Sequence, residues 1–167
     1  RHVVTGIQIT GIDKDDKEAL IAELPDGVTT VIHRGVNSLI ACVGKGKCKN
    51  GQMETAELAD YIERKHYGRK TSHKCKIGIS GCGRNCPDSM VKDIAFIGTS
   101  QGFMLAVGGN TGMRPEAGKI LMRKLSVEQA KKAADILIDW YAENGEPKER
   151  MGKLLERLGN PLENKTL

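Results

Sequence analysis

The chain has 167 residues, enough for one domain of ordinary size or for two small domains that share a core. Hydrophobic residues make up 39% of it and form no run long enough to cross a membrane, so we expect no membrane partner. The net charge of +5 would suit a polyanionic ligand, but aromatic residues are only 4% of the chain and offer little for stacking bases, which argues against a nucleic acid.

The N-terminal part reads as a strand, a short helix and a second strand. Residues 3–10 alternate in polarity and are rich in β-branched side chains, which predicts a strand. Asp13 suits the N-cap of a short helix that reaches Leu24. Residues 28–33 form the second predicted strand.

Strands and one helix then follow through the middle of the chain. A brief apolar run at residues 39–41 leads into the first cysteine, and residues 53–66 have the apolar spacing of a helix. Three further strands are predicted at residues 75–80, 94–99 and 103–107.

The C-terminal part is predicted to be helical. Ser126 and Gln129 form a capping-box pattern at the start of a helix over residues 127–141, and Pro147 opens a second helix. Residues 161–167 read as a tail. Together these patterns predict an α+β fold, with a mixed or antiparallel sheet, flanking helices and a helical C-terminus.

Four of the five cysteines lie in two short, glycine-rich loops that each follow a predicted strand. The first loop reads Cys42-Val-Gly-Lys-Gly-Lys-Cys48, and the second reads Cys82-Gly-Arg-Asn-Cys86. Such loops let several thiolates converge on an inorganic core and aim backbone amides at its sulfurs. The first spacing is longer than the pairs usual in structural zinc sites. Spacing alone therefore favours an iron–sulfur cluster, and zinc or unligated thiols stay open as alternatives.

The cysteine count also indicates the redox setting. Cys75 lies within a predicted strand, so we interpret it as a small buried apolar residue. Five cysteines without a basic-then-apolar leader are not typical of a disulfide framework and indicate a reducing compartment, so we expect a cytoplasmic protein. Basic residues gather near the cysteines in the sequence: Lys45, Lys47, Lys49, Arg69, Lys70, Lys74, Lys76 and Arg84.

These motifs resemble the cluster region of the siroheme-containing nitrite and sulfite reductases. The two matching cysteine stretches are Ala41-Cys-Val-Gly-Lys-Gly-Lys-Cys48 and Ile77-Gly-Ile-Ser-Gly-Cys-Gly-Arg-Asn-Cys86. Asp93-Ile-Ala-Phe-Ile-Gly98 is similar to the family's next strand, and Val107-Gly-Gly-Asn110 to its glycine loop. The resemblance covers residues 3–159.

The resemblance implies a division of the chain and two cofactors. Residues 1–36 would end a ferredoxin-like half-domain, residues 37–160 would form a 4Fe–4S and siroheme domain, and residues 161–167 the tail. The ligands of a 4Fe–4S cluster would be Cys42, Cys48, Cys82 and Cys86, the last of which would also bridge to the iron of siroheme. Siroheme carries eight carboxylates, so its site needs many basic side chains and backbone donors, which agrees with the basic residues near the cysteines.

The resemblance also implies a reaction and its partners. Electrons would pass through the cluster to the haem iron, where a small oxyanion, sulfite or nitrite, would be reduced. No flavin or nicotinamide fingerprint is present, so a separate ferredoxin-like or flavoprotein electron donor is implied. A homo-oligomer that completes the cofactor site is a further expectation.

Several residues take roles by the same resemblance. Lys74 and Lys76 alternate on one strand and so face the same side, where the family places substrate and haem; they are our catalytic candidates for anion binding and proton supply. A solvated strand face is the alternative. The candidates for cofactor contacts are Arg84, Asn85, Gly108, Gly109, Asn110 and Arg114. For the loop residues among them, a purely turn-shaping role is the alternative.

Two positions depart from the family's pattern. Asn37 and Val4 stand where the family usually has arginines. The sequence is therefore compatible with three functions. They are a siroheme and 4Fe–4S reductase, a 4Fe–4S electron-transfer module without siroheme or turnover, and a structural zinc domain that binds a polyanion.

Overall fold

The structure is a computed structural model that describes residues 13–23, 35–163 and 165–167. The chain divides into two units, residues 1–32 and residues 33–167. The described part of the first unit holds a short 3₁₀ helix, Lys14–Asp16, and the helix α1, Lys17–Ala22, which agrees with the helix predicted near Asp13. The strands predicted at residues 3–10 and 28–33 lie outside the described residues.

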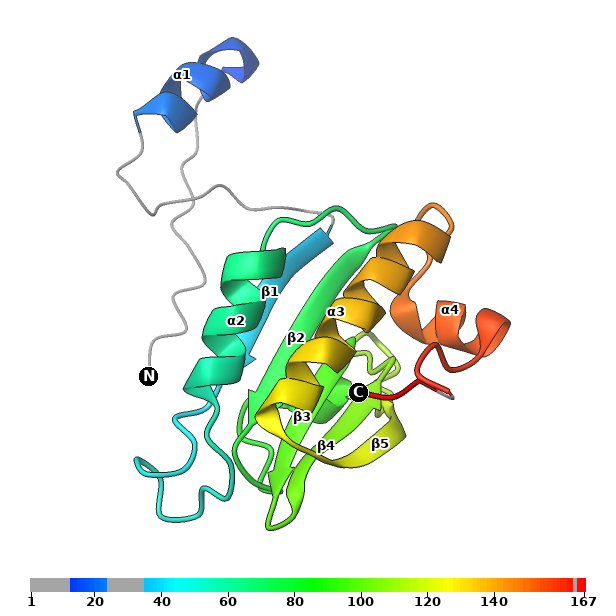
Figure 1. Cartoon of the computed structure of the whole chain (residues 1–167). Helices are drawn as coiled ribbons and strands as arrows, with labels where there is room; N and C mark the ends of the chain where they lie inside the picture. Colours follow the sequence, from blue (N-terminus) through cyan, green and yellow to red (C-terminus); the bar gives the residue numbers. More distant parts are fainter. Residues whose placement is uncertain (1–12, 24–34, 164) are drawn as a thin grey trace. The chain divides into compact units, whose positions relative to one another are not determined.

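The second unit is built on a five-stranded sheet whose order follows the chain (Figure 1). Its strands are β1 Gly35–Ala41, β2 Lys74–Ser80, β3 Ile94–Thr99, β4 Gly102–Val107 and β5 Lys119–Leu125. The first three strands are parallel to one another, and β4 and β5 continue the sheet in antiparallel fashion. The predicted mixed sheet is confirmed.

Two helices cover one face of this sheet (Figure 1). They are α2, Ala56–His66, and α3, Val127–Asn144, and α3 begins with the predicted capping box. Alternate side chains of β3, including Phe96, point into the fully buried core beneath the helices. Burying this apolar layer is the main force that holds the two helices on the sheet.

A second, smaller apolar cluster lies on the opposite face of the sheet. Ala95 and Ala106 are fully buried there, with Met90 packed against them. A Cβ on Gly78 would lie 2.6 Å from the Cα of Ser89, so the short 3₁₀ helix Ser89–Val91 lies directly against β2. None of the helices that the structure describes is long and apolar enough to span a bilayer.

The structure corrects the sequence prediction in three places. The strand β5 was not predicted; it is a mostly exposed edge strand whose lysines and arginine hide the polarity alternation of a strand. The strand β1 is longer than the apolar run at residues 39–41. The last helix, α4, runs Met151–Leu158 and so begins four residues after Pro147.

A carboxylate on α3 joins the two covering helices. Asp135 accepts hydrogen bonds from Tyr61 (2.7 Å), Lys65 (2.7 Å) and His66 (2.6 Å) of α2, and the His66 side chain is buried. Burial opposes ionisation of Asp135, but the hydrogen bonds from these three residues outweigh it and keep the pKa of Asp135 below its usual value.

Replacing Asp135 with asparagine should therefore lower the free energy of unfolding near neutral pH by about 2 kcal/mol, because three donors lose a charged acceptor. A lowered carboxylate pKa gives stability that is present above the unfolded value, about pH 4, and is lost as pH falls through the folded value. Denaturant titrations at several pH values measure this dependence. In the Asp135→Asn variant the free energy of unfolding should fall less steeply with decreasing pH than in the unmodified protein. Asp139→Asn, which breaks a more exposed pair with Arg69, is the matched control and should cost much less. Equal losses in both variants would contradict this role of Asp135.

Candidate cluster and anion site

The two cysteine loops begin at the same edge of the sheet. Because β1 and β2 are parallel neighbours, their carboxyl ends lie side by side, with Ala41 opposite Ile79. Cys42 follows β1 directly, and Cys82 lies two residues beyond the end of β2. Parallel pairing therefore brings together two loops that are forty residues apart in the sequence.

Backbone hydrogen bonds tie the loops to each other. The carbonyl oxygen of Gly81 accepts from the amides of Gln52 (2.8 Å) and Met53 (3.0 Å). The amide of Gly81 donates to the Sγ of Cys42 at 3.0 Å, and the hydroxyl of Thr55 donates to the carbonyl oxygen of Cys42 at 2.5 Å. An amide aimed at a cysteine sulfur is the kind of contact that stabilises a thiolate ligand and tunes a cluster.

A stack of four glycines brings the two loop backbones into direct contact. A Cβ on Gly51 would lie 2.5 Å from Gly44, one on Gly81 would lie 2.7 Å from the Cα of Gly44, and one on Gly98 would lie 2.3 Å from the carbonyl oxygen of Gly81. Gly44 also has a φ of +65°, a conformation that favours glycine. Side chains at these positions would push the loops apart.

The predicted ligands lie on these joined loops as free thiols. Cys42, Cys48 and Cys82 are half-buried and Cys86 is exposed, whereas Cys75 is fully buried in the core, as predicted. Among the described residues, no group of three or more cysteine, histidine, aspartate or glutamate side chains is arranged to hold a metal ion. The structure thus brings the loops together and leaves the ligand set as a prediction.

An open cavity of about 460 Å³ lies between the loops. Its lining comes from both of them: Lys49, Asn50, Gly51, Gln52, Cys82, Gly83 and Arg84. One thiol, that of Cys82, meets glycine backbone and two exposed cations here, and this surrounding suits a thiolate-bound, negatively charged iron–sulfur core.

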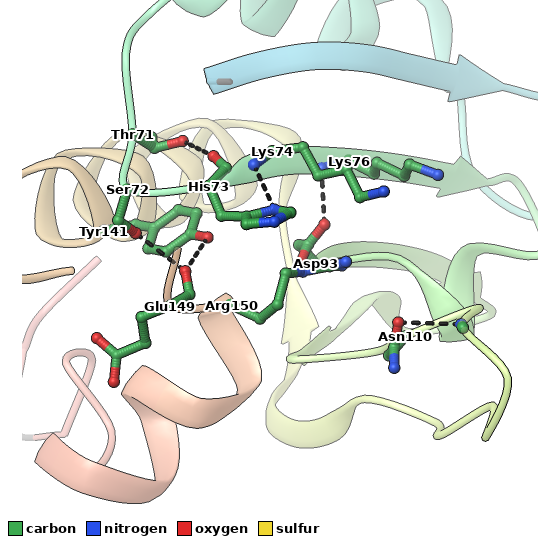
Figure 2. A network of polar contacts seen from close by, with 11 residues as sticks. Thr71, Ser72, His73, Lys74, Lys76, Asp93, Asn110, Tyr141, Glu149 and Arg150 are labelled. Atoms are coloured by element: carbon green, nitrogen blue, oxygen red, sulfur yellow. Dashed lines mark hydrogen bonds and ion pairs between the residues drawn. The ribbon is translucent and has the colours of Figure 1, made fainter. Parts of the chain in front are cut away.

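The two candidate lysines lie at the other end of β2. Lys74 and Lys76 extend in the same direction from the strand (Figure 2), and both are half-buried rather than solvated. They alternate with Cys75, which lies in the core beneath α2 and α3, so the two lysines lie on the other face of the sheet. From Lys76 to Ser80 the strand spans about 13 Å at 3.3 Å per residue. A ligand that contacts both the lysines and the cysteine loops must therefore be extended, and a large macrocycle with many carboxylates fits that requirement.

The sequence alone gave no sign of an ion pair beside these lysines. Asp93, whose side chain is 1% exposed, accepts the backbone amide of Lys76 on one oxygen at 2.9 Å. Its other oxygen accepts from Arg150 through Nε at 3.1 Å and Nη2 at 2.7 Å (Figure 2). Arg150 precedes α4 and lies 74 residues after Lys76, so no local motif could have linked the two.

Electrostatics at this end of β2 lower the proton affinity of one lysine. Burial lowers the pKa of Lys76, and the nearby charges of Lys74, Lys92 and Arg150 lower it further, against the opposing effect of Asp93. Burial raises the pKa of Asp93, although Arg150 and the Lys76 amide oppose that shift. A lysine of lowered pKa gives up its proton more readily to a bound anion.

The glycine loop is shaped by packing. A Cβ on Gly108 would lie 2.9 Å from the Cα of Gly152 in α4, and one on Gly109 would lie 2.5 Å from the carbonyl oxygens of Met90 and Lys92. The Oδ1 of Asn110 accepts the amide of Gly112 at 3.0 Å. These contacts account for the residue types in the loop without a cofactor. The loop and Arg150 nevertheless line a second cavity, of about 160 Å³.

The remaining predicted residues lie apart from one another. The Oδ1 of Asn85 accepts from the amide of Met90 at 3.2 Å and the hydroxyl of Ser80 at 3.4 Å, so this side chain helps to shape the second cysteine loop. Arg114 is exposed in the loop before β5. Asn37 is half-buried in β1, where the register with β2 shifts, and Val4 lies outside the described residues.

Sequence comparisons point to one group of proteins. Residues 33–161 match the family described as nitrite and sulphite reductase 4Fe-4S domain. The chain is 31% identical over 153 residues to an assimilatory-type sulfite reductase of Nitratidesulfovibrio vulgaris, covering 92% of this chain and 70% of that protein. It is also 31% identical over 153 residues to a nitrite reductase (NAD(P)H) of Bacillus subtilis, of which it spans only 19%.

Solved structures share the fold. Dissimilatory sulfite reductase I superposes with a TM-score of 0.74 at 13% identity, over 92% of this chain and 58% of that one. The NirA protein of Mycobacterium tuberculosis superposes with a TM-score of 0.67 at 18% identity, over 76% of this chain and 25% of that one. Identities this low show the likeness of fold alone.

Proposed function

Because the chain belongs to the nitrite and sulphite reductase 4Fe-4S domain family, we propose that it forms the cluster-bearing part of an oxidoreductase that reduces sulfite or nitrite. The observation that carries this proposal is the glycine-only contact that holds the two cysteine loops together at the carboxyl ends of β1 and β2. The predicted family is confirmed, and a 4Fe–4S cluster and siroheme are the cofactors that fit it.

Four thiols on the joined loops are the proposed ligands of the cluster: Cys42, Cys48, Cys82 and Cys86. When bound, the cluster would relay electrons, and siroheme would supply the iron at which an oxyanion loses oxygen. The amide of Gly81 supports the Cys42 sulfur. Hydrogen bonds to ligand sulfurs of this kind affect the reduction potential of a cluster.

The two lysines of β2 are the proposed catalytic residues. Lys74 and Lys76 would attract the substrate anion through their charge and donate protons as its oxygen leaves as water. Arg150 adds a third cation beside them. The proposed contacts to siroheme carboxylates come from the second cysteine loop, the glycine loop and the loop before β5: Arg84, Asn85, Gly108, Gly109, Asn110 and Arg114.

Electrons would come from a separate ferredoxin-like or flavoprotein donor. Lys45, Lys47, Lys49 and Arg84 are all exposed on the cysteine loops and would favour an acidic partner surface there. Completion of the cofactor site by a second copy of the chain, a cytoplasmic location and a domain division near residue 36 belong to the same proposal.

A second candidate is a 4Fe–4S electron-transfer module without siroheme or turnover. Asn37, in place of the arginine that the family usually carries, favours it because one cation expected near the substrate is missing from β1. In that case Lys74 and Lys76 would not bind a substrate anion, and the cluster would be held by the same two cysteine loops.

One visible spectrum of anaerobically purified protein separates these functions. We expect a Soret band with a second band at the red end of the spectrum, together with oxidation of a reduced viologen dye on addition of sulfite or nitrite. A broad brown shoulder without a Soret band would support the electron-transfer module instead. Colourless protein with stoichiometric zinc would refute both.

A further inference from the structure

The ion pair of Asp93 and Arg150 uses both oxygens of a buried carboxylate. One oxygen holds the Lys76 amide and the other holds two N–H groups of Arg150. The pair therefore fixes the backbone of β2 at the residue whose side chain we assign to proton supply. It also places the guanidinium of Arg150, which is 26% exposed, close enough to the Lys76 side chain for the two positive charges to interact.

Hydrogen bonds to the backbone just before Arg150 fix its position. The carbonyl oxygen of Glu149, the preceding residue, accepts hydrogen bonds from Tyr141 (2.8 Å) and Ser72 (3.0 Å), as Figure 2 shows. The amide of Lys148 donates to the carbonyl oxygen of Ser72 at 3.2 Å. The segment before α4 is thus fastened to the start of β2, so the guanidinium has little freedom to move away from Asp93.

We infer that the Asp93–Arg150 pair is a positioning device for Lys76, because it fixes the backbone of β2 at that residue and holds one negative and one positive group beside it. This inference rests on the proposed role of Lys76 in the reduction. Arg150 would replace, from the opposite end of the chain, part of the positive charge that the family carries on β1 and that Asn37 cannot provide.

Asp93 and Arg150 have opposite effects on the pKa of Lys76. Lys74 from β2, Lys92, and Arg150 each favour the neutral amine of Lys76, and Asp93 favours its charged form. The neighbouring strands β1 and β3 carry no titratable side chain. Removing Arg150 should therefore raise the pKa of Lys76, and removing the charge of Asp93 should lower it.

The test is the pH dependence of Lys76 acylation. The full-length chain is labelled with trace acetic anhydride across a pH series, and the extent of labelling at Lys76 is read by peptide fragmentation. We expect the midpoint to move to higher pH in Arg150→Gln and to lower pH in Asp93→Asn, relative to the unmodified protein. The double variant leaves no unpaired buried charge, so it guards against misfolding of either single variant, and its midpoint should lie between theirs.

Arg69→Gln is the matched control, because Arg69 is paired to Asp139 at 2.8 Å and does not contribute to the charge around Lys76. Its Lys76 midpoint should stay where it is in the unmodified protein. Shifts in the same direction for the two single variants, no shift in either, or an equal shift in the control would overturn the inference.

Labelling needs no turnover, so this inference and the proposed function can fail separately. Opposite shifts in a protein that reduces neither sulfite nor nitrite would establish the coupling and refute the proposed function. In an active protein, the alkaline limb of kcat/KM should move with the labelling midpoint. An unmoved limb would show that Lys76 is not the proton donor that this device serves, which also overturns the inference.

Discussion

Gly81→Ala should prevent the chain from retaining an iron–sulfur cluster. The new Cβ would lie 2.7 Å from the Cα of Gly44 and 3.0 Å from the carbonyl oxygen of Met53, and both contacts are with backbone that cannot rotate away. The loops must separate, which weakens the hydrogen bond from the Gly81 amide to the Cys42 sulfur. Overpacking of this kind costs about 1–3 kcal/mol.

The measurement is iron and sulfide per chain after anaerobic reconstitution, together with the visible absorbance of the cluster. Gly83→Ala is a close control because it adds the same methyl group two residues further along the same loop, where a Cβ would meet nothing within 4 Å. We expect that variant to keep its iron. Full iron content in Gly81→Ala would show that the glycine contact is not needed to hold the loops in a ligating arrangement.

Cys86→Ser should remove the cluster with little effect on folding. Cys86 is the exposed member of the four proposed ligands, so its replacement disturbs no packed core, while a hydroxyl is a poor substitute for a thiolate on iron. We expect iron to fall from about four atoms per chain to nearly none. The thermal unfolding midpoint of the metal-free protein should be unchanged.

Cys75→Ala should lower stability and leave the iron content unchanged, the opposite of what we expect for Cys86→Ser. Burial, and to a lesser degree Asp93, raises the pKa of the Cys75 thiol, so it stays protonated in the core and is no ligand. Its loss should lower stability by about 1 kcal/mol and leave the iron content unchanged. A cluster retained in Cys86→Ser, or lost in Cys75→Ala, would contradict the ligand assignment.

Much of the fold could be predicted from local pattern. Short apolar runs bounded by turn residues marked β2, β3 and β4, and Ser126 with Gln129 marked the start of α3, because these signals depend on residues close together in the chain. The edge strand β5 was missed because solvent on most of its surface allows Lys119, Arg123 and Lys124 to interrupt the apolar run that would mark a strand. Local pattern also placed the last helix four residues too early.

The sequence by itself determined the family and favoured an iron–sulfur cluster on the cysteine loops, because both inferences rest on residue types at fixed short spacings. Only the tertiary structure decided which backbones touch. The stacking of Gly44, Gly81 and Gly98 and the meeting of Arg150 with Asp93 depend on parallel strand pairing and on where α4 packs. Such contacts join residues far apart in the chain, and no local pattern encodes them.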